Sequence, residues 1–203
     1  WDGEEWQRWG DGLSDFAYFP TIVNDELYTT GRFWFRPFSI LPEYGVLRWT
    51  GSGWAEVGGP QWQGTRPVLG AVGGQLVAAG SFAPEGQPAS GNVVARWTGS
   101  QWQPFTTPVD NQFSALGELS GQLVAAGYFN TSGSTSLRRV ARWDGSAWVQ
   151  MNDGLFLGNS FNTIYSFASH QGSLYAGGAF GVLVPGGAAS GIARWDSAAN
   201  RWQ

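Results

Sequence analysis

The chain has 203 residues and a formal net charge of −4, and 42% of its residues are hydrophobic and 16% aromatic. This composition can fill a sizeable core, which excludes a disordered tail, and the negative charge excludes a surface built to bind nucleic acid. The chain has no cysteine, which excludes disulfides, thiolate metal sites and cysteine nucleophiles.

Two sequence markers recur in fixed phase along the whole chain. The first is a Trp that opens a tight turn, at positions 1, 49, 97, 143 and 195, with a second Trp a few residues later. The second reads LYTTGRF at 27–33, LVAAGSF at 76–82, LVAAGYF at 123–129 and LYAGGAF at 174–180. The resulting spacing of 46–52 residues is typical of four-stranded propeller blades.

In chain order, the markers predict a strand stub at 1–9 and then four units, at about 10–57, 58–105, 106–151 and 152–203. The second unit shows the expected plan of four strands, at 67–72, 75–82, 92–98 and 101–105. Gly73-Gly74 and Ser120-Gly121 supply the positive backbone angles that two-residue hairpin turns need.

Four-stranded units with apolar residues on both faces must stack, and radial stacking gives a propeller. The predicted fold class is therefore all-β: a single β-propeller array of four-stranded antiparallel blades, with about four repeats of 46–52 residues. Because both ends of the chain offer a last strand, we expect it to be part of a longer propeller, with a closed ring of four blades as the alternative.

The recurring Trp residues are expected in the core, since periodic aromatic side chains fill space between sheets. An Arg precedes the marker Trp at 48, 96, 142 and 194, and we expect it to make a cation-π or carbonyl contact between blades.

The loops between the second and third strands hold the first candidate site. Those at 34–44 and 181–190 are conspicuously apolar and predict an exposed hydrophobic patch that binds a protein partner or a neighbouring subunit. The alternative is that the first of these loops folds back over its own blade. The predicted partner-binding residues are Trp34, Phe35, Phe38, Ile40, Leu41, Val182 and Leu183.

The loops between successive units hold a second candidate, a carbohydrate site. A sugar needs an aromatic face for stacking and polar groups for its hydroxyls. Residues of these types are Gln61, Trp62, Asp110, Asn111 and Asn159, and ordinary polar loop chemistry is the alternative explanation for them.

Catalytic chemistry finds little support in the sequence. The one His, His170, lies in a predicted turn and offers no catalytic triad. No EF-hand loop is present, and no metal or other cofactor is expected. A secreted polysaccharide-active enzyme stays open only as a further alternative, because sequence alone cannot show a pair of acids flanking a cleft.

With LYAGGAF at 174–180 followed by GIARWD at 191–196, the chain resembles bacterial secreted proteins built of LYAGGxF…IARWDGxxW repeats. It resembles the kelch and galactose-oxidase type of propeller more distantly. The resemblance implies a secreted or cell-surface propeller and no particular substrate. The run DGSAW at 144–148 resembles the Asp-box hairpin of sialidases, which implies a structural turn there.

Together these features predict a non-enzymatic extracellular β-propeller interaction or scaffold module within a larger protein or assembly, at the cell surface, secreted or periplasmic. A carbohydrate-binding propeller is the alternative. No run of apolar residues is long enough to span a membrane, and neither a membrane span nor a nucleic-acid partner is expected.

Overall fold

The computed structural model describes residues 3–6, 13, 16–33, 43–59, 62, 66–83, 88–151, 155–156, 162–184 and 187–203. The side chains of residues 156, 183–184 and 187–189 are not described. Over these ranges the chain is all-β, as predicted, and none of them contains a helix. Accordingly, the described part of the chain holds no helix of the length and apolar character that crossing a membrane requires.

The second sheet follows the predicted four-strand plan closely. Its strands are antiparallel and hydrogen-bond in chain order, and its predicted and observed ends differ by at most one residue. Its middle strands are rich in Val and Ala and are buried on both faces, because other sheets cover both sides. The strands are β5 (Val68–Val72), β6 (Gln75–Ser81), β7 (Asn92–Trp97) and β8 (Trp102–Pro104).

The first and third sheets repeat this plan. The third carries a small extra hairpin between its second and third strands. The first sheet comprises β1 (Ala17–Val23), β2 (Glu26–Phe33), β3 (Glu43–Trp49) and β4 (Trp54–Glu56). The third comprises β9 (Phe113–Leu119), β10 (Gln122–Gly127), β13 (Val140–Trp143) and β14 (Trp148–Gln150), with the hairpin formed by β11 (Thr131–Ser132) and β12 (Thr135–Ser136).

The fourth sheet has longer middle strands, and this corrects the prediction of a loop at 181–190. Strand β17 continues to Val184 and β18 begins at Gly187, so most of that segment is a paired hairpin. The first part of β17 pairs with β16, and its Gly181 and Val182 pair with β15. The strands are β15 (Leu155–Phe156), β16 (Thr163–His170), β17 (Ser173–Val184), β18 (Gly187–Asp196) and β19 (Arg201–Trp202).

The turns between the first two strands of each sheet have the predicted backbone conformation. Both turn residues have positive φ in all four sheets, and the second sheet has Gly73 at 57° and Gly74 at 71°. Two such residues twist the hairpin in the same sense as the strands it joins. The other three pairs are Asn24-Asp25, Ser120-Gly121 and Gln171-Gly172.

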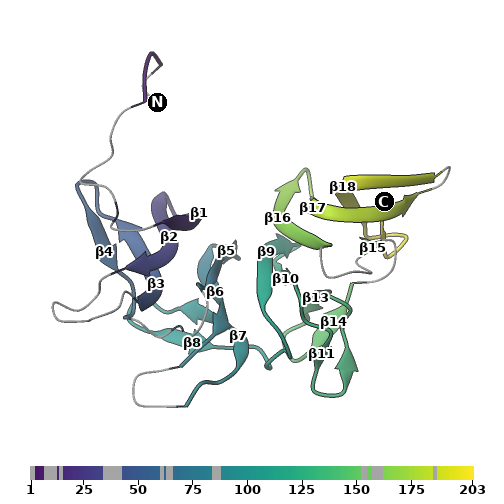
Figure 1. Cartoon of the computed structure of the whole chain (residues 1–203), viewed down its shortest axis with the longest axis horizontal. Helices are drawn as coiled ribbons and strands as arrows, with labels where there is room; N and C mark the ends of the chain where they lie inside the picture. The colour runs from purple at the N-terminus through teal and green to yellow at the C-terminus, as the bar shows by residue number, and fades with distance from the viewer. Residues whose placement is uncertain are drawn as a thin grey trace.

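The four sheets follow one another in a curved row (Figure 1). Their first strands line the inner side, where β5 contacts both β1 and β9, and β9 contacts β16. The first and fourth sheets stand at opposite ends of the row in Figure 1, and no strand pairing joins them among the described residues. The predicted strand stub is not seen in residues 3–6, which form bends, and the rest of 1–9 lies outside the described residues.

Three apolar clusters fill the three junctions between neighbouring sheets. Side chains from the first and second sheets form one cluster, those from the second and third another, and those from the third and fourth the last. Each cluster draws on equivalent positions of the repeat, as in the series Leu76, Leu123 and Leu174, which are 3%, 2% and 0% exposed. The core therefore lies between sheets, and each sheet depends on its neighbours.

Candidate functional site

The marker Trp residues form one structural unit in every sheet. The two Trp of each turn lie directly opposite each other on the last two strands, with ring centroids 5.3–5.4 Å apart at angles of 52–68°. Such edge-to-face pairs suit the quadrupole of the indole ring. The prediction that these Trp residues belong to the core is confirmed for Trp102, Trp143, Trp148, Trp195 and Trp202, which are at most 8% exposed. It is wrong for Trp6, which is 85% exposed.

The same Trp residues also connect neighbouring sheets. The indole Nε1–H of Trp102 donates to the carbonyl of Val57, 2.9 Å away, and that of Trp148 donates to the carbonyl of Thr107, 3.0 Å away. Each acceptor follows the last strand of the preceding sheet. These Trp side chains thus fix the spacing of the row and are unavailable to a ligand.

The turns between the last two strands carry structural carboxylates. Asp144 Oδ1 accepts hydrogen bonds from the amides of Ser146 and Ala147, both 2.8 Å away, and from the Ser146 hydroxyl at 2.9 Å. These bonds, led by that of Ala147, lower the pKa of Asp144. The structural role expected for the DGSAW turn is thereby confirmed.

The Arg residues that precede the marker Trp were expected to make contacts between sheets, but the contacts of three of them differ from this prediction. Arg48 forms a 2.6 Å ion pair with Glu26 on the neighbouring strand, and Arg142 bonds Gln122 in the same way at 3.0 Å. Arg96 bonds Gln103. These three contacts stay within one sheet, because each Arg side chain bonds a residue of a directly neighbouring strand.

The Glu26 carboxylate is also bonded to the phenol of Tyr28, which donates to Oε2 at 2.6 Å. This bond, followed by the charge of Arg48, lowers the pKa of Glu26 against a partial desolvation cost. Burial, and then the bond to Glu26, raises the pKa of Tyr28 to about 12. The cluster is a structural ion pair at the start of β2.

The predicted partner patch is described only in part. Trp34, Phe35, Phe38, Ile40 and Leu41 lie outside the described residues. Val182 is 1% exposed in the cluster between the third and fourth sheets, which corrects its assignment to an exposed patch. It is buried because β17 extends and pairs with β15 where a loop was expected. Leu183 belongs to the same strand, and its side chain is not described.

Trp62, the aromatic centre of the predicted sugar site, is a core residue. It is 4% exposed, and its ring lies edge-on to Phe82 at 5.1 Å and to Trp102 at 5.7 Å. Its backbone bridges Tyr44 and Phe82, so the segment between the first two sheets inserts the indole into their junction. Trp62 therefore has no free face for a sugar, which corrects that prediction.

The polar members of that set do not gather around Trp62. Asp110 is an exposed loop residue, and its Oδ1 accepts hydrogen bonds from the backbone amides of Asn130 and Thr131, at 2.8 and 3.0 Å. Partial desolvation raises the pKa of Asp110, but these hydrogen bonds together outweigh it and lower the pKa. Asn111 is exposed, and its side chain bonds the amide of Gln112. Gln61 and Asn159 lie outside the described residues.

Two cavities on the inner side of the row were not predicted. We call the larger one, of about 680 Å³, the strand cavity. The inner strands of the four sheets, β1, β5, β9 and β16, all line it. Its apolar lining residues include Leu69, Leu116 and Phe167. The cavity also holds the carboxylate of Glu118, which accepts a hydrogen bond from the backbone amide of Gly73 at 2.7 Å. This bond connects the third sheet to the first turn of the second sheet.

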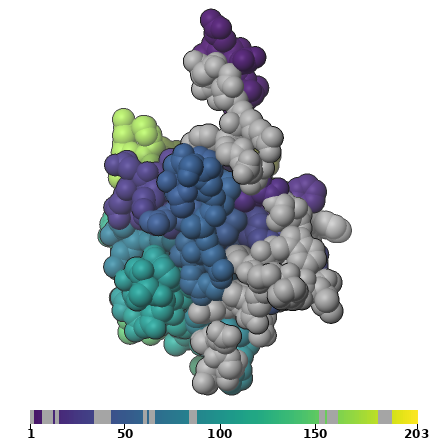
Figure 2. Space-filling model, turned by 90° about the vertical axis from the view of Figure 1, so that its left-hand side faces the viewer, coloured from purple at the N-terminus to yellow at the C-terminus, as the bar shows by residue number. Residues whose placement is uncertain are grey.

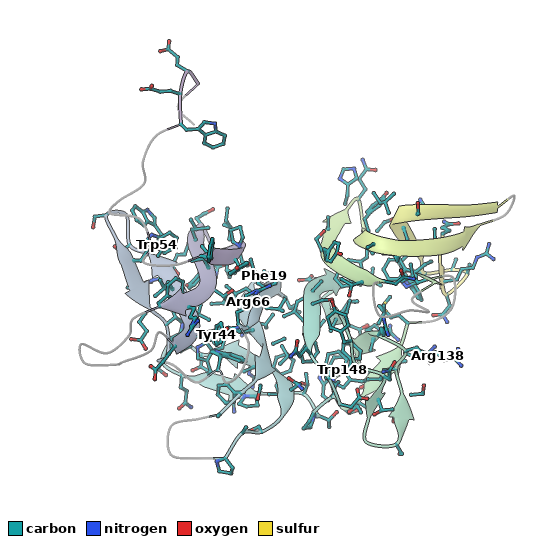
Figure 3. The ribbon with its side chains drawn as sticks, in the orientation of Figure 1. Phe19, Tyr44, Trp54, Arg66, Arg138 and Trp148 are labelled. Carbon is teal, nitrogen blue, oxygen red and sulfur yellow. The ribbon has the colours of Figure 1, made fainter. Side chains whose placement is uncertain are left out.

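The second cavity, of about 440 Å³, shares part of this wall, and we call it the tyrosine cavity. Four tyrosines line it, and the guanidinium of Arg66 lies 3.9 Å from the ring centroid of Tyr18. Figure 3 shows Arg66, Phe19 and Tyr44 gathered where the first and second sheets meet the inner side. The lining tyrosines are Tyr18, Tyr44, Tyr128 and Tyr165.

Sequence reasoning missed these tyrosines, although one signal was present. Tyr18, Ser114 and Tyr165 each stand six residues before the first residue of their sheet's first turn, and all three line the tyrosine cavity. Equivalent positions of the inner strands come together because those strands stand side by side. His170, in contrast, is an exposed residue at the end of β16, with Tyr175 as a ring neighbour.

Known proteins add no assignment to this geometry. No protein-family model matches the chain, and no curated protein matches it. Within the described ranges, no three residues among His, Asp and Glu are grouped so that they could hold a metal ion.

Proposed function

We propose that the chain is a section of an extracellular β-propeller that serves as a non-enzymatic interaction module in a larger assembly. The observation that supports this function is the state of its two end faces. Each end face exposes side chains whose counterparts in the other sheets are buried at the junctions between sheets. Because an exposed apolar face of a repeat unit is stabilised by stacking, we expect another sheet of the same repeat to cover it.

The outer face of the fourth sheet is the clearer case. Val46, Val94 and Val140 occupy one repeat position on the third strand, two residues before the Arg, and each is buried against the following sheet, at 0%, 0% and 2% exposed. Ile192 stands at the same position of the fourth sheet and is 64% exposed. Ile192 is exposed because no following sheet covers it among the described residues.

The outer face of the first sheet shows the complementary surface. The leucine that opens the second marker is buried against the preceding sheet in the other three units, but Leu27 is only half-buried. Ile22, its direct partner across the β1–β2 hairpin, is 68% exposed. Figure 2 looks onto the left-hand side of the row in Figure 1 and shows residues of the first sheet, in purple and blue, at the surface.

The two end faces therefore carry the two halves of the junction that the molecule forms three times internally. The outer face of the fourth sheet of one chain should therefore fit the outer face of the first sheet of another chain. We propose that the neighbouring subunit supplies the missing half, in a head-to-tail contact. Burying Ile192 as its internal counterparts are buried would stabilise such a contact by roughly 1.5–3 kcal/mol.

The oligomeric state of the 203-residue chain tests this function. Light scattering over a range of concentrations should show self-association, and Ile192→Glu should abolish it because a charge would be desolvated at the contact. Ser100→Glu, in the exposed turn between β7 and β8, adds the same charge away from both faces and should have no effect. A wild-type chain that stays monomeric at every concentration would contradict the proposal.

A further inference from the structure

The tyrosine cavity combines features that the interaction-module function does not use. The cavity surface holds three of the chain's exposed aromatic side chains: Tyr18 is 36% exposed, Tyr128 37% and Tyr165 60%. They come from three different sheets. Aromatic rings that converge on one hollow from separate elements offer a ligand several stacking faces.

Polar groups stand between these rings. Gln112 and Ser114 line the cavity at the start of the third sheet. Thr163, at the start of β16, also lines it, and its hydroxyl oxygen is buried without a hydrogen-bond partner among the described residues. A buried hydroxyl without a partner is rare, because it forfeits the hydrogen bond that water would have provided.

The cavity also carries one positive charge. Arg66 is exposed and is the only charged residue among the described residues that line it. Its guanidinium lies over Tyr18, which orients the group but leaves the donors at its edge for a carboxylate. The polar groups of the cavity are therefore complementary to an uncharged or negatively charged ligand.

We propose that the tyrosine cavity binds a short saccharide that bears a carboxylate. Sugar rings present an apolar face to tyrosine and hydroxyls to amide and hydroxyl partners, and a uronic acid adds the anion that Arg66 would hold. The volume of about 440 Å³ lies within the range of small-molecule sites. A purely apolar ligand would leave the polar groups unpaired, and a phosphate-rich ligand would find a single cation.

A peptide is the other class that tyrosine-lined surfaces bind. Such recognition uses an extended groove or a free sheet edge. The tyrosine cavity instead lies among the starts of first strands that stand side by side, and its tyrosines converge from several sheets. This site is independent of the end faces, so either proposal can fail without the other.

Calorimetric titration of the full chain tests the saccharide site. The probes are a trisaccharide that contains glucuronic acid and the neutral trisaccharide with glucose in its place. The wild-type chain should bind the acidic probe more tightly. Tyr165→Ala should weaken binding of both probes by about ten-fold, and Arg66→Gln should make the two affinities equal.

Tyr175→Ala is the matched control, since Tyr175 belongs to the same sheet as Tyr165 but lines neither cavity. It should leave both affinities unchanged, and circular dichroism should show the fold of all three variants retained. The proposal is overturned if neither probe binds, or if Tyr165→Ala leaves binding unchanged. Equal wild-type affinities would overturn the carboxylate assignment. Binding of a proline-rich peptide without either saccharide would identify the site as a peptide site and also overturn it.

Discussion

At the scale of single residues, the repeat pattern separates what the sequence could predict from what it could not. Trp102 and Trp148 recur in phase, and their burial in the core followed from that recurrence. Trp62 breaks the pattern and was expected to be exposed, yet it is 4% exposed between two sheets. Its neighbours in space belong to two different units, and the spacing of markers along the chain carries no information about such contacts.

The carboxylate of Asp144 gives a prediction for pH dependence. Its pKa is lowered in the folded chain, so its charge stabilises the fold above the unfolded-state pKa of about 4. This contribution disappears as pH falls through the lower folded-state value. Asp144→Asn keeps the shape but removes the charge, and thermal unfolding should show it less stable than wild type at pH 7. The difference should close at acid pH, and a difference that persists at pH 2 would contradict this assignment.

At the scale of elements, local turn chemistry was predictable and loop conformation was not. The four first turns have the positive backbone angles that residues such as Gly73-Gly74 indicate. The segment 181–190 has the composition of a loop but forms part of the hairpin of β17 and β18. The Gly and Pro residues of that segment favour a loop, but pairing with β15 stabilises a strand there. This pairing depends on tertiary contacts, which the local sequence does not show.

The glycine of the LxxxGxF marker gives a prediction at this scale. A Cβ on Gly127 would clash with the carbonyl oxygen of Gln112 and lie 2.9 Å from the Cα of Phe113, so the backbone would have to move. Gly127→Ala should therefore lower the free energy of unfolding by about 1–3 kcal/mol in urea titrations. Gly80 holds the same repeat position, but its nearest contact is the Trp62 side chain at 3.4 Å. Gly80→Ala should cost less, and equal losses would contradict the steric argument.

At the scale of the whole molecule, the markers predicted four stacked four-stranded units, and the structure contains three four-stranded sheets and one five-stranded sheet in a curved row (Figure 1). The candidate sites were predicted less well. Sequence reasoning looked for aromatic residues in long loops, whereas the inner cavities are built from the first strands of all four sheets. Only the stacking of units brings Tyr18 and Tyr165 to one cavity, so no single repeat reveals the site.

A mixing experiment with two variants tests the head-to-tail contact between the end faces. Leu27→Glu spoils only the first-sheet face and Ile192→Glu only the fourth-sheet face, because both positions are buried at the internal junctions. Each variant alone should be monomeric, because every head-to-tail contact would then include a charged half. An equimolar mixture retains one intact half of each kind, so sedimentation should show a one-to-one dimer. Dimers of either variant alone, or a mixture that stays monomeric, would contradict the account.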